Sequence, residues 1–257
     1  MPGLIINGKD VVVPGVAIVN YHDHPELKLK PGEDMRARHT RWIRSICWHN
    51  TKNLPTKLKP GMGSDTQLEK RITQWWAKDA KHAGAHLCVD WDTMVGCLAD
   101  LSLDAAYHAS ALNEVSIGGE LYEDNKGTVY AAQLETAVKL TIWMCQRFGI
   151  QMQIPSPSYN KVIERIRIGG DDCVGVFGHC HQYSGKPNDP GLHIFTALEK
   201  AGFHVTDFEH GEDLDFWKKV QRRFGLNPDG IPGPQTCDAL QVRGFAYGLY
   251  DWKSAIV

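Results

Sequence analysis

Apolar residues occur in short runs along much of the chain, and several of these runs predict β-strands. Residues 3–20 predict two strands around Asn7–Gly8, a dipeptide typical of tight hairpin turns. Residues 42–49 are mostly apolar and predict a buried strand. Further strands are predicted at residues 85–90, 94–98, 115–121 and 174–178, and the first two of these are expected to pair with each other.

A different spacing, with apolar residues three or four positions apart, predicts helices. The clearest case is residues 130–148, where one apolar stripe runs to Gly149, a residue type that often ends a helix. Residues 21–41 are polar and contain two prolines, so we expect them to be loop. Because strands and helices alternate, we expect an α/β fold that extends to about residue 205. Helices are also predicted at residues 65–81 and 192–200.

The last part of the chain has a different character. An acidic stretch at residues 207–213 predicts a linker or an exposed turn, and an amphipathic helix is predicted at residues 214–225. A second helix is predicted at residues 235–242, after a turn rich in proline and glycine. We therefore expect a small all-α hairpin module beyond the α/β domain.

Composition narrows the classes of function. The 257 residues include 28 Lys and Arg against 30 Asp and Glu, and this net charge of −2 argues against a protein that coats nucleic acid. There is no run of 18 apolar residues, so no membrane span is expected. The N-terminus lacks a basic segment followed by an apolar one, so we expect synthesis in a cytoplasm without a signal peptide. Seven cysteines without a C-x-x-C pair argue against a disulfide framework and a cysteine-based zinc knuckle.

Three residues with metal-binding side chains stand at or near the ends of predicted elements. His49 ends one apolar strand, His179 follows another, and Asp189 comes shortly afterwards. Strand alternation places Cys47 and His49 on the face opposite the apolar Ile46, so we expect His49 to face a groove. Two imidazoles and one carboxylate leave the fourth tetrahedral position of a zinc ion open for water, which is typical of catalytic zinc.

Other interpretations of these residues are open. Asp189 precedes Pro190 and Gly191, a pattern that also predicts a helix N-cap. A single histidine at a strand end is more often an ordinary polar or core residue than a ligand. A cysteine hydrolase that uses Cys47 or Cys180 with a nearby histidine is a further alternative.

Short motifs around these residues occur in a particular order. The string His49-Asn50-Thr51 follows the apolar strand, and nine residues separate Gly178-His179 from Asp189-Pro190-Gly191. Between them lie Ala85-His86-Leu87, Tyr107-His108-Ala109, Asn113 and Ser116-Ile117-Gly118-Gly119-Glu120-Leu121. Together, across residues 42–202, these motifs resemble the type 2 N-acetylmuramoyl-L-alanine amidases. That family includes phage endolysins, bacterial recycling enzymes and animal peptidoglycan recognition proteins.

The resemblance implies a central mixed β-sheet flanked by helices and a set of site residues. His49, His179 and Asp189 would bind Zn²⁺, and Glu120 would be the catalytic residue that moves a proton from the zinc-bound water to the leaving amine. Glu120 also has support from strand alternation, which places it beside the small Ser116 and Gly118. The resemblance further implies substrate contacts from His108 and Asn113, and oxyanion stabilisation by Lys186.

Two positions depart from the family's pattern. The family's lysine usually lies two residues before the aspartate, where this chain has Pro187, so Lys186 would have to act from one position earlier. Gly119 replaces a residue that is commonly β-branched, which predicts a wider site. His86 is expected to support the site from below rather than to bind zinc.

A second resemblance concerns the C-terminal segment. Residues 212–243 resemble a peptidoglycan-binding module, although a helical hairpin that only packs on the catalytic domain is an alternative. We therefore divide the chain into an N-terminal extension at 1–41, a zinc amidase domain at 42–205 and this module at 212–243. Together these features predict a monomeric phage or prophage endolysin that reaches the wall after release and cleaves peptidoglycan between N-acetylmuramic acid and L-alanine. The alternatives are a cytoplasmic muropeptide-recycling amidase and a non-catalytic peptidoglycan-binding protein.

Overall fold

The computed structural model describes most of the chain up to residue 206. The described residues are 2–39, 42–51, 83–123, 129–155, 174–182, 189–206, 218, 221–222 and 225–228. The predicted helix at 65–81 and the predicted catalytic Lys186 lie outside them, as does nearly all of the predicted module at 212–243.

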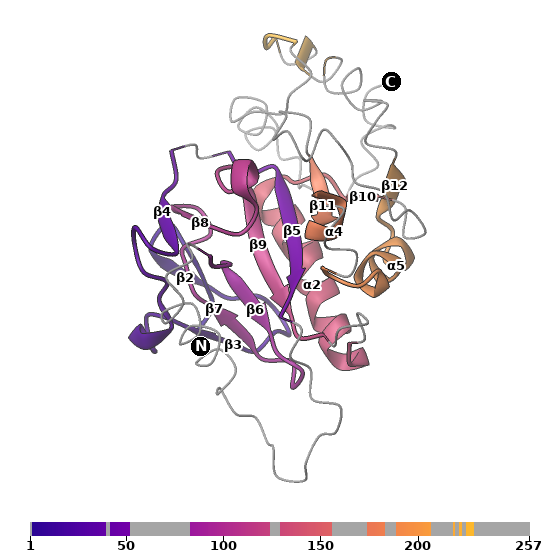
Figure 1. The fold of residues 1–257 in the computed structure, drawn as a ribbon. Helices are drawn as coiled ribbons and strands as arrows, with labels where there is room; N and C mark the ends of the chain where they lie inside the picture. Colours follow the sequence, from indigo (N-terminus) through magenta and orange to yellow (C-terminus); the bar gives the residue numbers. More distant parts are fainter. Residues whose placement is uncertain are drawn as a thin grey trace.

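A six-stranded mixed sheet forms the centre of the fold, in the order β11-β5-β9-β6-β7-β3 (Figure 1). The first four strands of this order run parallel to one another, and β7 is antiparallel to β6. The strand at the far edge, β3, is parallel to β7. The bounds are β11 Gly175–Gly178, β5 Ser45–Asn50, β9 Ser116–Leu121, β6 Leu87–Val89, β7 Val95–Cys97 and β3 Ile18–Asn20. This sheet confirms the predicted α/β fold class.

The hairpin predicted near the N-terminus is confirmed. β1 (Leu4–Ile6) and β2 (Lys9–Val11) pair antiparallel on either side of Asn7 and Gly8. Both turn residues have positive φ, 52° at Asn7 and 71° at Gly8. Two positive φ angles are what the tightest hairpin turn requires, which explains this dipeptide.

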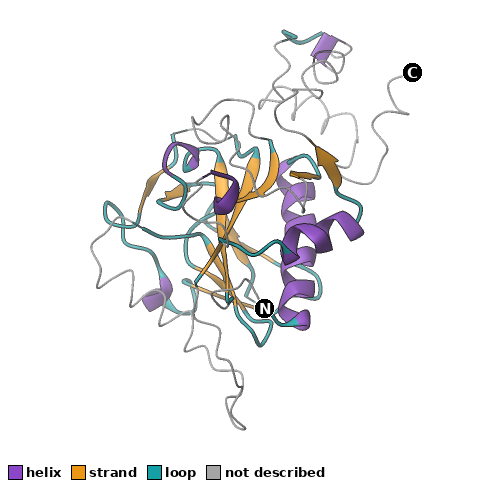
Figure 2. Cartoon of the chain, turned by 45° about the vertical axis from the view of Figure 1, so that its right-hand side comes forward, coloured by secondary structure: helices purple, strands orange, loops and turns teal. Residues whose placement is uncertain are grey.

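Two helices lie against one side of the sheet (Figure 2). They are α2 (Ala131–Phe148) and α5 (His193–Lys200), and both agree with the predicted helices. As predicted, Gly149 ends α2, in the left-handed conformation with φ 67°. Among the described residues, no helix combines the length and the apolar character that a bilayer crossing requires.

The main core lies between this pair of helices and the sheet. The apolar face of β5 contributes Ile46 and Trp48, both fully buried, and they join the same cluster as Leu140 and Met144 of α2. The indole Nε1 of Trp48 also donates a hydrogen bond to Thr141 Oγ1 at 3.1 Å. The alternation predicted for this strand therefore sets its core face correctly.

The opposite face of β5 is covered at Cys47 by another segment of the chain. Cys47 packs there against Ala109, Leu112 and Phe177 in a separate small cluster. His49, two residues further along the same face, is only 4% exposed. The segment that includes the 3-10 helix η2 (Ser110–Leu112) packs against this face at Cys47, and the expected groove at His49 stays a prediction.

The N-terminal residues are part of the sheet assembly. The predicted loop at 21–41 is correct for most of its described residues, but the stretch also contains the short helix η1 (Pro25–Leu27) and the strand β4 (Met35–Ala37). β4 pairs antiparallel with β8 (Asp104–Ala106), which is distant in sequence. Such a pairing leaves no mark on local hydrophobic periodicity.

A pair of short strands near α5 completes the described elements. β10 (Gln153–Pro155) and β12 (His204–Thr206) are parallel and form a separate two-stranded sheet. A four-residue helix, α4 (His179–Gln182), follows β11 directly and begins at one of the predicted metal ligands.

Candidate metal centre

The register of three parallel strands places predicted site residues in one row. His49 on β5 is the direct partner of Glu120 on β9. On the other side of β5, Trp48 pairs with Gly178, the last residue of β11, so His179 follows at the level of His49. These positions lie at the carboxyl ends of the strands, where ligands usually bind in open α/β sheets.

The side chains of the three predicted ligands meet beside this row. Nδ1 of His49 lies 3.0 Å from Nδ1 of His179. Oδ2 of Asp189 lies 3.2 Å from the same His179 nitrogen, and Oδ1 lies 3.8 Å from Nδ1 of His49. All three residues are less than a tenth exposed. The sequence therefore identified three residues that the fold brings together, with His49 lying 130 positions before His179 along the chain.

Backbone contacts fix the orientation of Asp189. The backbone N–H of Asn50 donates to its Oδ1 at 2.9 Å, which leaves Oδ2 turned toward His179. The N-cap of α5 is Leu192, so the alternative role of Asp189 as a helix cap is wrong. Asp189 is instead positioned by the end of β5, the strand that carries His49.

This donor set fits a tetrahedral metal ion. Bonds of about 2.0–2.2 Å from zinc to nitrogen and oxygen imply separations of about 3.4 Å between neighbouring ligand atoms. The two imidazole nitrogens are 3.0 Å apart, and Oδ2 of Asp189 is 3.2 Å from the nitrogen of His179, both close to this value. One ligand atom from each of the three residues lies within 4.8 Å of the other two. Two imidazoles and a carboxylate supply three ligands, so one coordination position is left for water or substrate.

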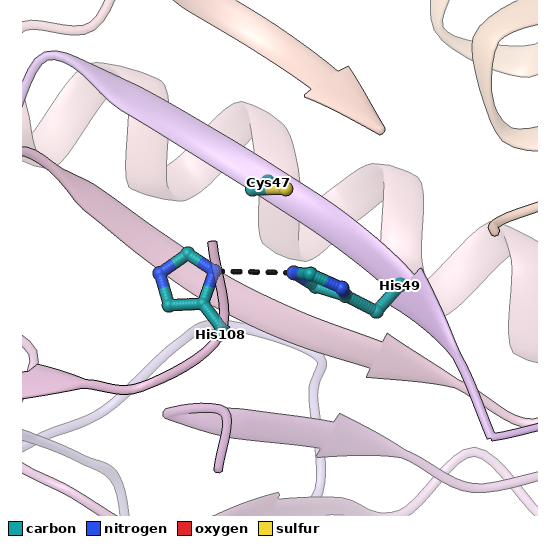
Figure 3. A group of neighbouring side chains, drawn as sticks. All are labelled: Cys47, His49 and His108. Atoms are coloured by element: carbon teal, nitrogen blue, oxygen red, sulfur yellow. Dashed lines mark hydrogen bonds between the residues drawn. The ribbon is translucent and has the colours of Figure 1, made fainter. Parts of the chain in front are cut away.

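A second group of potential ligands shares one residue with the first. Cys47, His49 and His108 also have donor atoms within 4.8 Å of one another (Figure 3). Here His49 presents its other nitrogen, Nε2, which lies 3.1 Å from Nδ1 of His108. Cys47 belongs to an apolar cluster with Leu112 and Phe177, so we favour the group that contains Asp189.

His108 and Asn113, the predicted substrate-binding residues, lie on the segment that covers β5. Asn113 Oδ1 accepts hydrogen bonds from the backbone N–H groups of His108 and Ala109, so this oxygen stabilises the turn that carries His108. Burial, followed by the neighbouring His49, His86, Arg38 and His179, holds the pKa of His108 well below its ordinary value. The His108 ring is therefore neutral near pH 7.

His86 supports the site strand, as the sequence predicted. Its Nδ1 accepts the backbone N–H of Gly118 at 3.0 Å, so the proton of the neutral ring is on Nε2, which donates to the Asp104 carbonyl at 3.0 Å. Burial, and then the positive charge of Arg38, lowers the pKa of His86 to about 3. Arg38 in turn donates to the backbone carbonyls of Asn113, Glu114 and Ser116.

The neutral state of His86 predicts acid sensitivity of the fold. Between the folded-state pKa of about 3 and the ordinary 6.5, the unfolded chain binds a proton that the folded chain does not. The free energy of unfolding therefore falls as the pH drops from about 6.5 toward 3, by about 1.4 kcal/mol per pH unit for this group. Urea unfolding of the wild type and of His86→Gln tests this, because glutamine keeps a donor and an acceptor but does not titrate. Between pH 7 and pH 5, the difference in stability between the two proteins should shrink by about 2 kcal/mol; an unchanged difference would contradict the neutral His86.

Glu123 is a residue of the site that the sequence did not single out. It is fully buried, two residues after β9, and its Oε2 accepts the backbone N–H of Gly191 at 2.7 Å. This bond ties the end of β9 to the turn that carries Asp189. No motif or strand alternation in the sequence pointed to Glu123, and its hydrogen bond to Gly191 becomes apparent only in the folded structure.

Removing the Glu123 carboxylate should destabilise this turn. In Glu123→Ala the buried N–H of Gly191 loses its acceptor, which we expect to lower the free energy of unfolding by about 1–3 kcal/mol. Glu123→Gln keeps an accepting oxygen and should lose less. Urea unfolding measures both, with Glu199→Ala on the exposed surface of α5 as a control that should change little. Equal stability of the alanine and glutamine variants would contradict the role of this hydrogen bond.

Gly119 has a different role from the one its sequence position suggested. A Cβ at Gly119 would lie 2.6 Å from the Trp48 ring, so this glycine makes room for the indole on the core face. Glu120 is on the opposite face and partly exposed. The expected widening of the site at Gly119 is therefore wrong, because the space is filled by Trp48.

The structure does not favour a cysteine nucleophile. Cys47 is fully buried, and Cys180 is 3% exposed. Burial, together with the negative charge of Asp189, raises the pKa of the Cys180 thiol to about 12. A thiol with such a pKa carries almost no thiolate near neutral pH, and the thiolate is the reactive form.

Comparison with known structures identifies related folds. Peptidoglycan recognition protein-LE, solved in complex with tracheal cytotoxin, is 13% identical with a TM-score of 0.50, over 76% of this chain and 99% of that one. The endolysin amidase LysCS from Clostridium intestinale is 15% identical with a TM-score of 0.47, over 76% and 98%. An AmpD structure is 18% identical with a TM-score of 0.43, over 79% and 99%. The first of these likenesses supports the fold.

Sequence comparison identifies the family, whereas the structural likeness supports only the fold. No curated protein matches the chain. The family model described as N-acetylmuramoyl-L-alanine amidase, Amidase_2, matches residues 39–192, which is more than half of the chain and includes the three candidate ligand residues. The chain therefore belongs to the N-acetylmuramoyl-L-alanine amidase family.

Proposed function

We propose that this protein is a zinc-dependent amidase that cleaves peptidoglycan at the amide bond between the lactyl group of N-acetylmuramic acid and L-alanine. The convergence of His49, His179 and Asp189 beside Glu120 carries this proposal. Membership of the amidase family supports the bond and the substrate class. The donor chemistry supports the metal, because two imidazoles and a carboxylate are a typical catalytic zinc set.

Each residue of the row has a distinct task in this reaction. Bound to His49, His179 and Asp189, zinc would supply Lewis acid chemistry, lowering the pKa of a coordinated water from about 16 to about 7 and polarising the carbonyl. Glu120 accepts the proton of the attacking water as the bond to the lactyl carbonyl carbon forms. It then donates that proton to the alanine nitrogen as the carbon–nitrogen bond breaks.

The remaining assignments of the site are also part of the proposal. Lys186 would stabilise the oxyanion, and it lies outside the described residues. His108 and Asn113 would line the substrate side of the turn that covers β5. Metal binding would require both imidazoles to be neutral, since a protonated histidine cannot be a ligand.

We further propose that the protein acts as a monomeric phage or prophage endolysin. The predicted module at 212–243 would hold it on the wall polymer and raise the local concentration of substrate. A cytoplasmic recycling amidase would have little use for such a module. A non-catalytic recognition protein would need no zinc ligands and no Glu120, and this chain has all four residues.

Mass analysis of digested sacculi tests the proposed reaction. We expect new L-alanine amino termini and intact muramic acid ends, with no new reducing sugars, and loss of these products after treatment with a chelator. New reducing ends would mean a glycosidase instead. Binding to sacculi without any new termini, by protein that contains zinc, would leave only the recognition function.

A further inference from the structure

His49 uses both of its ring nitrogens, and they face different partners. Nδ1 lies 3.0 Å from His179 on the side of the proposed metal, whereas Nε2 lies 3.1 Å from Nδ1 of His108 (Figure 3). A neutral imidazole carries one proton. The location of this proton therefore decides whether Nδ1 has a lone pair to offer the metal.

A chain of hydrogen bonds determines that location, and it begins at a backbone carbonyl. The carbonyl oxygen of Leu112 can only accept, and Ser116 Oγ lies 2.6 Å from it, so the hydroxyl donates its single proton there. Nε2 of His108 lies 3.1 Å from the same hydroxyl oxygen. Since the hydroxyl proton is used, this Nε2 must be the donor.

The same reasoning then gives the position of the proton on His49. With its proton on Nε2, the neutral ring of His108 has an accepting Nδ1, which faces Nε2 of His49. His49 consequently carries its proton on Nε2. Its Nδ1 lone pair is directed toward His179 and Asp189.

The surroundings hold the intermediate ring in place. A Cβ at Gly118 would lie 2.5 Å from Cγ of His108, so the ring fits over this glycine of β9. Asn113 Oδ1 accepts the backbone N–H of His108 at 3.0 Å. Ser116 is fully buried, so water does not compete for its hydroxyl. This chain of hydrogen bonds from Leu112 through Ser116 and His108 to His49, which we call the relay, is thus made of residues with fixed positions.

We infer that His108 and Ser116 are positioning residues of the metal centre, which hold His49 as the tautomer that binds the metal through Nδ1. This inference rests on the proposed zinc site and gives His108 a task that does not depend on substrate. Metal-binding histidines are commonly oriented by an acceptor on their second nitrogen. Here the acceptor is another histidine, His108. The Leu112 carbonyl, acting through the Ser116 hydroxyl, determines which nitrogen of His108 carries the proton.

Zinc affinity in the absence of substrate tests the inference. We would titrate zinc against a chelating indicator with the wild type, His108→Leu, His108→Asn and Ser116→Ala. His108→Leu keeps bulk but has no acceptor, and should weaken zinc binding about 10–100-fold. His108→Asn can place its amide oxygen near the position of Nδ1 and should restore much of the affinity, while Ser116→Ala should show an intermediate loss. His204→Gln, exposed on β12, is the control and should bind zinc like the wild type.

Nitrogen NMR of the histidine rings gives a readout that does not depend on any variant folding. In zinc-loaded wild-type protein labelled with ¹⁵N-histidine, His49 should have a protonated Nε2 and a metal-bound Nδ1. The opposite assignment, with Nε2 bound to the metal, would overturn the inference in favour of the group that contains Cys47.

Other results separate this inference from the proposed function. Wild-type zinc affinity in folded His108→Leu, accompanied by a raised KM, would overturn the inference and make His108 a substrate contact only. Absence of zinc from the wild-type protein would overturn the proposed function and the inference together. Activity with zinc but a wild-type affinity in all relay variants would overturn the inference alone.

Discussion

Replacing His179 with alanine is expected to reduce amidase activity by at least about 1000-fold. The substitution removes one of the three proposed ligands, and Asp189 and His49 alone would not hold zinc. The protein should therefore lose zinc and with it several kcal/mol of transition-state stabilisation. The rate at which L-alanine amino termini appear in sacculi and the zinc content of the purified protein are the measurements.

The control for this experiment is a variant at a histidine far from the site in sequence. His204→Ala changes an exposed residue of β12 and should leave both activity and zinc content unchanged. Full wall hydrolysis by folded His179→Ala would rule out the proposed metal centre. Loss of activity with zinc still bound in full would mean that His179 acts in some way other than as a ligand.

Glu120→Gln should have the second large effect, with a different signature. Glutamine keeps the size of the side chain but cannot take up a proton, so kcat should fall by about 10²–10⁴-fold. Zinc affinity should stay near that of the wild type, because Glu120 is the register partner of His49 and not one of the three ligands. Single-turnover hydrolysis together with zinc titration separates the two properties.

A control for Glu120 comes from the neighbouring buried carboxylate. Glu123→Gln is expected to change stability slightly while keeping most of the activity, since Glu123 holds the Gly191 turn. If Glu120→Gln retained wild-type kcat, proton transfer would have to be assigned elsewhere. If it lost zinc as well, Glu120 would be part of the metal environment.

Local periodicity was sufficient for most of the central fold. The stripe that ends at Gly149 predicts α2, and the run that ends at His49 predicts β5, because a buried helix face and a buried strand repeat at different intervals. The same reasoning missed the two short elements within residues 21–41. The strand β4 in that stretch is three residues long and is held by its pairing with β8, which no local pattern records.

The grouping of the three candidate ligands could be predicted because chemistry and position agree at each of them. His49 and His179 are imidazoles at the ends of apolar strands, and Asp189 occurs at a spacing that the family motif fixes. The hydrogen-bond chain from Leu112 to His49 could not be predicted. It depends on the Ser116 hydroxyl reaching the Leu112 carbonyl and on His108 folding over Gly118, and both are products of tertiary packing.

The place of β3 in the sheet has a practical consequence for choosing expression boundaries. A fragment trimmed to the family match at residues 39–192 would lack β3 and Arg38. Without β3, the strand β7 would become an unpaired edge of the sheet. Without Arg38, the backbone carbonyls of Asn113 and Ser116 would lose the hydrogen bonds from its guanidinium group. Exposed edges of this kind invite chain-to-chain pairing. Such a shortened protein would be prone to precipitate, and its poor yield would say nothing about whether the intact enzyme works.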